Sequence, residues 1–225
     1  ITFSPSDKRE KSSWCDLPPL GMENRMNRIV NRFVYSLIHL IYGSKHFIMD
    51  PRRWSAISAY IVYNYLRYHG VELTFGTVRM VGFPIVRKAR GSKIALGRSV
   101  TLISHSRGNP AGINHPVILA TLREGATISI GDGCGFSGTS ICSATSVSIG
   151  DHTGFGANAV VYDTDFHSVQ HFGTPLDGIH AAPSKPIRVG NYVWVGAHAM
   201  ILKGVQIEDH FVIPAGAVVR YNICK

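Results

Sequence analysis

The sequence lacks an apolar run long enough to cross a membrane. A membrane-spanning helix needs about 20 consecutive apolar residues, and the longest uncharged stretch near the N-terminus, Phe33 to Gly43, is about half that length. Charged residues make up 16% of the chain and hydrophobic residues 45%, a balance that excludes an intrinsically disordered protein. We therefore expect the 225 residues to form one globular domain, or one domain with a small appendage.

Cysteine is scarce, and its positions form no recognised pattern. The four cysteines stand at positions 15, 134, 142 and 224, with no CxxC pair and no histidine at zinc-finger spacing. Neither a zinc knuckle nor a disulfide framework is indicated. We therefore expect a cytoplasmic protein in a reducing environment.

Acidic residues are scarce in the first part of the chain only. Residues 1–99 hold 16 Lys and Arg against 6 Asp and Glu, whereas residues 100–225 hold 7 against 8. The net charge of +9 therefore belongs to the N-terminal part. A basic segment attracts anionic partners such as lipid headgroups, a charged glycan or nucleic acid, and a solvated basic face is the alternative. The segment carries no recognised nucleic-acid motif, so we expect no nucleic-acid partner.

A period of six residues dominates the second part of the chain. Apolar residues recur at this spacing, and the residue four positions after most of them is small or of medium size. The set comprises Leu96 and Leu102; Ile130, Phe136 and Cys142; after one extra residue Ile149, Phe155 and Val161; and then Val189, Val195, Ile201, Ile207, Ile213 and Val219. Neither a helix nor a simple alternating strand has this period. It predicts short strands wound into triangular coils that stack by parallel pairing, rather than a β-sandwich.

Polar residues and glycines mark the bends between these strands. Asp132, Asp151, Asn191 and Asp209 stand at such bends, often beside glycine. Two segments interrupt the period. Residues 103–127 predict a partly irregular coil or excursion, and residues 162–186, rich in proline and glycine, predict an extruded loop. A long loop in a compact repeat is more often functional than idle.

The N-terminal part does not follow the repeat. We expect a loose polar arm over residues 1–20, a basic helical segment over 21–75 and the repeat domain over 76–225. The helical segment is predicted to hold two helices: 24–42, with arginines opposite an apolar face, and about 51–68, rich in Trp and Tyr. Two roles stay open for residues 24–68: capping the open end of the repeat, or peripheral attachment to the inner face of the cell membrane.

Three sequence runs resemble the bacterial hexapeptide-repeat acyltransferases. They are ISIGDGCGFSG, VSIGDHTGFGANAVVYDTDFH and KPIRVGNYVWVGAHAMILKGVQIEDHFVIPAGAVV, and the resemblance covers about residues 92–222. It extends to sugar and polysaccharide O-acetyltransferases of the maltose, galactoside and colanic-acid type. It implies an all-β fold, a left-handed parallel β-helix of hexapeptide repeats, here with an N-terminal α-helical segment. It also implies a homotrimer that transfers acetyl from acetyl-CoA to a sugar or glycan hydroxyl, in surface polysaccharide or glycolipid biosynthesis.

His167 is the catalytic residue that the resemblance implies. It follows DTDF at the root of the predicted loop, where the family places a general base in a groove between subunits. An imidazole titrates near neutral pH, so it can take the proton of an attacking hydroxyl and pass it to a leaving thiolate. Asp163 and Asp165 are candidates to orient its ring. Candidates for acceptor binding are Ser137, Asn114 and His115.

The resemblance also implies where acetyl-CoA binds. In the family the pantetheine arm lies along the coils and is held mainly by backbone groups. The matching small residues are Gly196, Ala197, Ala215 and Gly216. Trp194 matches a family aromatic, with packing between coils as the alternative. Lys203 and Arg220 are candidates to neutralise the phosphates.

Alternatives to a transferase remain at this stage. A carbonic anhydrase-like zinc lyase on the same fold would need three histidines, and His167, His171 and His198 are the candidates. The pattern is irregular, so we expect no metal. An acyl-enzyme on Cys142 is disfavoured, because the repeat predicts that this thiol points into the core. A non-catalytic membrane-associated scaffold is the third alternative.

Overall fold

The computed structural model describes residues 56–168 and 178–224. The polar arm, the helix expected over 24–42 and the start of the next helix lie outside these residues. From Ala56 onward the second predicted helix is present as α2, Ala56–Tyr68. In the described part of the chain, no helix is long and apolar enough to cross a membrane.

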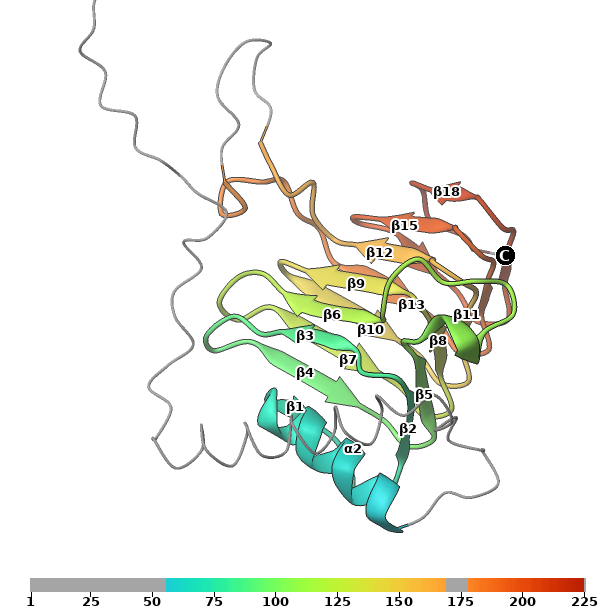
Figure 1. The fold of residues 1–225 in the computed structure, drawn as a ribbon. Coiled ribbons are helices and arrows are strands. Elements are labelled where there is room, and N and C mark those ends of the chain that lie inside the picture. The colour runs from blue at the N-terminus through green and yellow to red at the C-terminus, as the bar shows by residue number, and fades with distance from the viewer. Residues whose placement is uncertain (1–55, 169–177, 225) are drawn as a thin grey trace, which may run out of the picture. The chain divides into compact units, whose positions relative to one another are not determined.

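Within the described residues, eighteen short strands form three six-stranded parallel sheets (Figure 1). Sheet A contains β1 (Val71–Glu72), β4 (Lys93–Leu96), β7 (Thr127–Ile130), β10 (Ser146–Ile149), β13 (Ile187–Val189) and β16 (Gln206–Ile207). Sheet B contains β2 (Val78–Val81), β5 (Val100–Ile103), β8 (Gly135–Ser137), β11 (Gly154–Phe155), β14 (Trp194–Val195) and β17 (Val212–Ile213). Sheet C contains β3 (Ile85–Arg87), β6 (Ile118–Thr121), β9 (Ser140–Ser143), β12 (Val160–Tyr162), β15 (Met200–Leu202) and β18 (Val218–Val219). Each successive strand belongs to the next sheet, so the chain winds as a three-sided parallel β-helix.

The predicted apolar ladder forms the core of this helix. In sheet A, Ile130, Ile149 and Val189 stand in register on successive coils, and all three are buried. In sheet B, the rings of Phe136 and Phe155 stack with centroids 5.0 Å apart. Stacking of like residues removes continuous apolar surface from water, which is the main stabilisation available to a narrow solenoid.

The predicted position of Cys142 is wrong by one residue. Ile141, with no exposed surface, takes the interior position and pairs with Leu119 and Val161, whereas Cys142 pairs with Ala120 and Tyr162 on the outer side. The step from Phe136 to Ile141 is five residues rather than six, since Gly138 takes a left-handed conformation (φ 54°) in the bend. Neighbouring groups still bury the Cys142 thiol and raise its pKa to about 12.

The predicted bend residues form a ladder of their own along the corner between sheets A and B. The Oδ1 atoms of Asp132, Asp151, Asn191 and Asp209 accept backbone N–H groups of the preceding coil at 2.7–2.8 Å. The N–H of Asn191 thereby holds the pKa of Asp209 below its usual value. These bonds satisfy backbone donors where the strands end, and they confirm the bend positions.

The first interruption is an excursion from the coil. The chain leaves β5 at Ile103, forms the 3₁₀ turn η2 (Ser106–Gly108) and re-enters at β6. Its far part returns to the corner between sheets B and C, because Asn158 accepts the N–H of Asn114 at 2.8 Å. The prediction of an irregular excursion is therefore confirmed for residues 104–117, while residues 118–121 are a regular strand.

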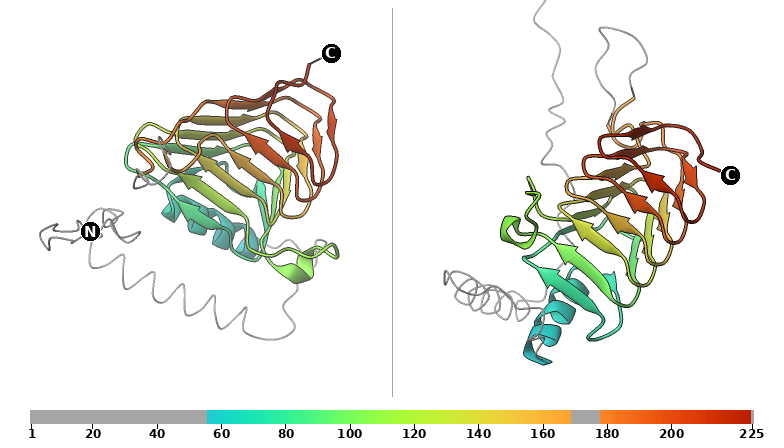
Figure 2. Two further views of the ribbon diagram at one scale, coloured as in Figure 1. Left: turned by 90° about the horizontal axis from the view of Figure 1, so that it is seen from above. Right: turned by 90° about the vertical axis from the view of Figure 1, so that its right-hand side faces the viewer.

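Helix α2 covers the N-terminal end of the β-helix, beneath β1 and β2 (Figure 2). Ala59, Val62 and Leu66 recur at three- and four-residue spacing and are buried against the first coil. The helix thus closes an end of the core that would otherwise face water.

Candidate active site

The second interruption begins at the end of β12, at the corner between sheets C and A. His167 lies here, half-buried, five residues after the end of that strand. Phe166 precedes it with a left-handed backbone (φ 64°) and places its ring edge-on to Tyr162, with centroids 5.1 Å apart. A bulky residue rarely adopts this conformation, and such strain concentrates at functional sites.

Both ends of the loop are pinned where it leaves the coil. The Asp165 N–H donates to the carbonyl of Pro183 (3.1 Å), and the Lys185 N–H donates to the carbonyl of Asp163 (2.9 Å). The Arg123 guanidinium, from the bend after β6, donates to the carbonyls of Ile179 and Ala182. No motif in the sequence predicts this role for Arg123. The one signal for it is that Arg123 stands in a bend at the same corner of the β-helix as the loop.

The two carboxylates predicted to orient His167 have other partners. Asp163 is fully buried and accepts four hydrogen bonds of 2.6–2.9 Å from the bend that follows β9, formed by Ser143, Ala144 and Thr145. Asp165 is exposed and pairs with the Lys203 ammonium at 2.5 and 2.7 Å. Asp163 therefore holds the coil, and Asp165 engages one of the two cations predicted to bind phosphate.

The small residues predicted to line the cofactor lie at a different corner, between sheets B and C. Gly196 is buried, and a Cβ there would collide with the backbone of Ala215 on the next coil. Its smallness is therefore required by coil stacking. Ala197 is half-buried, whereas Ala215 and Gly216 are exposed, and a Cβ on Gly216 would meet nothing within 4 Å. Of these four residues, Gly216 is the one whose backbone is open to a ligand.

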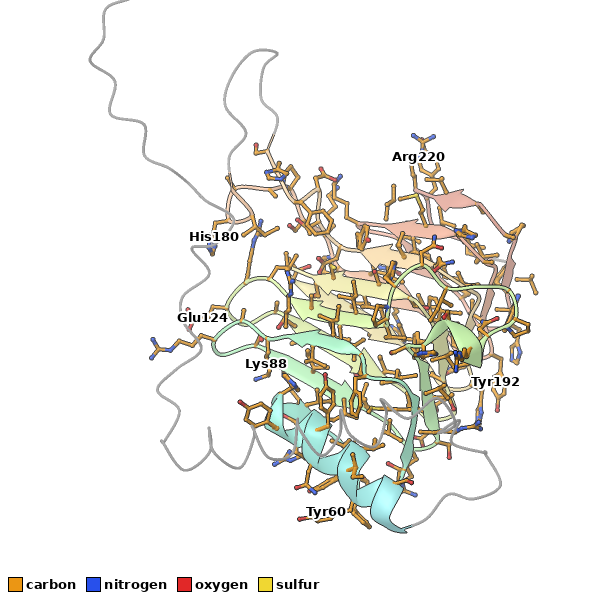
Figure 3. All side chains as sticks on the ribbon, in the orientation of Figure 1. Tyr60, Lys88, Glu124, His180, Tyr192 and Arg220 are labelled. Carbon is orange, nitrogen blue, oxygen red and sulfur yellow. The ribbon has the colours of Figure 1, made fainter. Side chains whose placement is uncertain are left out.

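Trp194 and Arg220 are both accessible. Trp194 is 52% exposed on the outer face of sheet B, and its ring lies over Gly154, where a Cβ would be 2.7 Å away. The contact with Gly154 agrees with the alternative that Trp194 packs between coils. Arg220 is exposed just after β18, at the C-terminal end of the stack (Figure 3).

The three acceptor-binding candidates gather at the corner between sheets B and C. Asn158 bridges the excursion by accepting the N–H of Asn114 and donating to the carbonyl of Gly112 (3.3 Å). His115 Nδ1 lies 2.8 Å from its neighbour's carbonyl, that of Pro116. Ser137 is buried and accepts the Asn158 N–H through its backbone carbonyl (2.9 Å).

One chain therefore separates the candidates into two groups. His167, Asp165 and Lys203 lie along one long edge of sheet C, while the acceptor candidates and the small residues lie along the other. The chain crosses the sheet in the five residue steps from Asn158 to Asp163, which corresponds to roughly 16 Å at about 3.3 Å per residue. His198 belongs to the edge opposite His167, since its N–H bonds to the carbonyl of Ala157. Within residues 56–168 and 178–224, no group of three metal-ligating side chains converges; His171 lies outside them.

Comparison with known proteins bears on this fold. Residues 186–221 match the family described as the hexapeptide repeat of succinyl-transferase. The fold is the left-handed β-helix of hexapeptide-repeat acyltransferases. The predicted fold class is therefore confirmed, with the hexapeptide repeat on β13 to β18.

Individual relatives cover different parts of this β-helix. The chain is 50% identical over 40 residues to galactoside O-acetyltransferase of Escherichia coli (strain K12), which is 18% of this chain and about a fifth (20%) of that protein. Among solved structures, a variant of AntD, an N-acyltransferase from Bacillus cereus in complex with dTDP and coenzyme A, has a TM-score of 0.50 at 15% identity. That likeness covers 72% of this chain and 80% of AntD. A maltose O-acetyltransferase from Clostridium difficile 630 has a TM-score of 0.43 at 15% identity, over 89% and 81% of the two chains.

Proposed function

We propose that this protein is an acetyl-CoA-dependent O-acetyltransferase of the cytoplasm that acts on a sugar hydroxyl, in surface polysaccharide or glycolipid biosynthesis. The observation that carries the proposal is the position of His167. It is half-buried at the root of a pinned loop, next to a strained residue, on a β-helix of the acyltransferase type. The repeat match and the galactoside O-acetyltransferase relative support the same chemistry.

In this proposal His167 is the general base. Its ring nitrogen takes the proton of the acceptor hydroxyl while the oxygen forms a bond to the thioester carbonyl carbon. When the tetrahedral intermediate collapses, the carbon–sulfur bond breaks and the proton passes to the leaving thiolate. A backbone N–H near the groove supplies the hydrogen bond that the oxyanion needs. Direct transfer of this kind needs no nucleophile from the protein.

The outer faces of the sheets support a homotrimer. Apart from Ala95, the outer side of sheet A carries Glu, Lys, Thr, Ser, Arg and Gln side chains, whereas that of sheet C is mostly apolar. The outward residues of sheet C are Ile85, Ile118, Ser140, Val160, Met200 and Val218 in one row and Arg87, Ala120, Cys142, Tyr162 and Leu202 in the next. Arg87 and Ser140 interrupt these rows, and Ala120 and Ser140 are already buried within one chain, but the partly exposed members are mostly apolar. A mostly apolar face of this kind is typical of an interface between subunits.

A three-fold axis facing sheet C would also assemble the site. When three prisms turn the same face to a common axis, each one's first edge of that face adjoins the second edge of its neighbour. The edge with His167 would therefore meet the neighbour's edge with Asn114 and the small residues. The roughly 16 Å separation within one chain becomes a shared groove that takes acceptor and donor.

Replacement of His167 tests the proposed function. We expect His167→Ala to lower acetyl-CoA-dependent thiol release, measured across a panel of sugars, on the order of 10²-fold or more. His180→Ala is the matched control, because His180 is exposed on the returning arm of the same loop (Figure 3). Equal rates of thiol release for the wild type and His167→Ala would exclude His167 as the general base. If no sugar in the panel supports activity and acetyl-CoA does not raise the melting temperature, the non-catalytic scaffold is favoured.

A further inference from the structure

The N-terminal end of the β-helix displays aromatic side chains to water. Tyr60 is 62% exposed and Tyr68 45%, both on the side of α2 that faces away from the coils. Phe75, from the turn between β1 and β2, is 52% exposed and packs edge-on against Tyr63 of α2, with centroids 5.4 Å apart. Figure 3 shows Tyr60 at the outer extremity of the helix, pointing away from the stack.

The same end is strongly basic. Residues 56–99, which form α2 and the first coils, contain seven Lys and Arg and a single carboxylate, that of Glu72. Glu72 pairs with Lys93 at 2.9 Å. Arg67 is exposed on α2 beside Tyr68, and the stem of Lys88 lies against Gly70, where the helix ends. We call Tyr60, Arg67, Tyr68, Phe75 and Lys88 the cap surface.

The rest of the β-helix does not share this charge. Residues 100–225 hold 7 Lys and Arg against 8 Asp and Glu, so the positive potential is concentrated at one end of the molecule. Such a concentration orients a molecule at a charged plane, because the electrostatic attraction decays within a Debye length of about 10 Å.

We propose that the cap surface docks on an anionic membrane surface, with Arg67 and Lys88 at the lipid phosphates and the aromatic rings in the interfacial layer. The exposed aromatic rings favour lipid over a soluble polyanion. Tyrosine combines an apolar body with a polar tip that suits the headgroup region, phenylalanine can bury its ring at the acyl boundary, and neighbouring basic residues gain free energy near anionic lipids. The cap surface is also an end of the prism, so docking leaves the three outer faces of the β-helix accessible. An acetyltransferase held this way would meet lipid-linked acceptors.

Vesicle flotation of the full chain tests the docking. Vesicles of phosphatidylcholine alone are compared with vesicles containing 30% phosphatidylglycerol, at low and at high salt. We expect binding to the anionic vesicles only, and weakening at high salt. Arg67→Glu with Lys88→Glu should weaken binding on the order of tenfold or more. Lys185→Glu with Arg188→Glu is the matched control, since both residues are exposed and the net charge changes equally.

The aromatic residues separate a membrane from a soluble polyanion. Tyr60→Ser with Phe75→Ser should reduce vesicle binding severalfold while retaining the wild-type circular dichroism spectrum and the wild-type affinity for duplex oligonucleotide or heparin. Equal loss of vesicle binding in the cap and control charge variants would overturn the proposal. Unchanged vesicle binding in the variant with both aromatic substitutions would also overturn it, because the surface would then be a general polyanion site.

Discussion

At the scale of single residues, Asp163 and Asp165 show how two neighbouring carboxylates acquire different roles. Both precede His167 in the sequence, and both were reasonable candidates to orient its ring. Burial separates them: Asp163 is enclosed and saturated by four donors, whereas Asp165 meets a lysine in solvent. A buried carboxylate is stable only when hydrogen-bonded in this way, and an exposed ion pair contributes little.

We predict a large difference in stability between the two alanine variants. Asp163→Ala leaves buried donors of Ser143, Ala144 and Thr145 without an acceptor, so the free energy of unfolding should fall by about 3 kcal/mol or more. Asp165→Ala should lower it by less than about 1 kcal/mol. Urea denaturation followed by circular dichroism measures both. A similar small loss for the two variants would show that the Asp163 bonds are not required by the coil.

At the scale of the elements, the stacking distance of the coils decides which glycines are needed. Gly156 directly follows β11, and Gly135 is the first residue of β8. The sequence does not show which of these two glycines the fold requires. In the structure a Cβ on Gly156 would lie 2.5 Å from the backbone nitrogen of Ala197, whereas a Cβ on Gly135 would meet nothing within 4 Å. The first glycine therefore allows the next coil to approach, and the second has open space above it.

The two alanine substitutions should consequently differ. Gly156→Ala must push one coil from the next and should lower the free energy of unfolding by about 1–3 kcal/mol. Gly135→Ala should leave stability unchanged or raise it slightly, since it restricts the unfolded chain. Thermal melts of the two purified variants make the comparison. Equal melting temperatures would mean that the coil spacing near Ala197 adjusts without cost.

At the scale of the whole molecule, the three faces of the prism have different outer surfaces. The polar face of sheet A suits solvent, and the apolar face of sheet C suits burial. The candidate site is divided between the two edges of sheet C, so the proposed activity depends on assembly. The cap surface lies at an end of the prism, and its proposed docking is compatible with that assembly.

A charge placed on sheet C should break the proposed trimer. Met200→Lys, on the outer side of β15, should yield a folded monomer of 24.6 kDa that has lost thiol release activity. Ser148→Lys on the outer face of sheet A should remain trimeric and active. Sedimentation velocity gives the mass, and circular dichroism checks the fold. A Met200→Lys protein that sediments like the wild type would exclude sheet C as the interface.

The sequence alone determined the coil architecture, because each hexamer places one apolar residue inside and one polar or glycine residue at a bend. It also located the loop and the histidine at its root. It could not set the register at Cys142, because the bend at Gly138 is one residue shorter than the regular bends and the six-residue period does not predict the length of a bend.

Other outcomes depended on contacts between distant coils. Arg123 pins the loop from 56 and 59 residues away, and Asp163 binds a bend about twenty residues earlier. Such partners meet only because coils stack, and spacing along the chain does not reveal them. The tertiary structure alone decided which side chains share an edge of sheet C. Winding brings residues of different coils together at one edge, and it places residues at the two ends of the same strand at opposite edges.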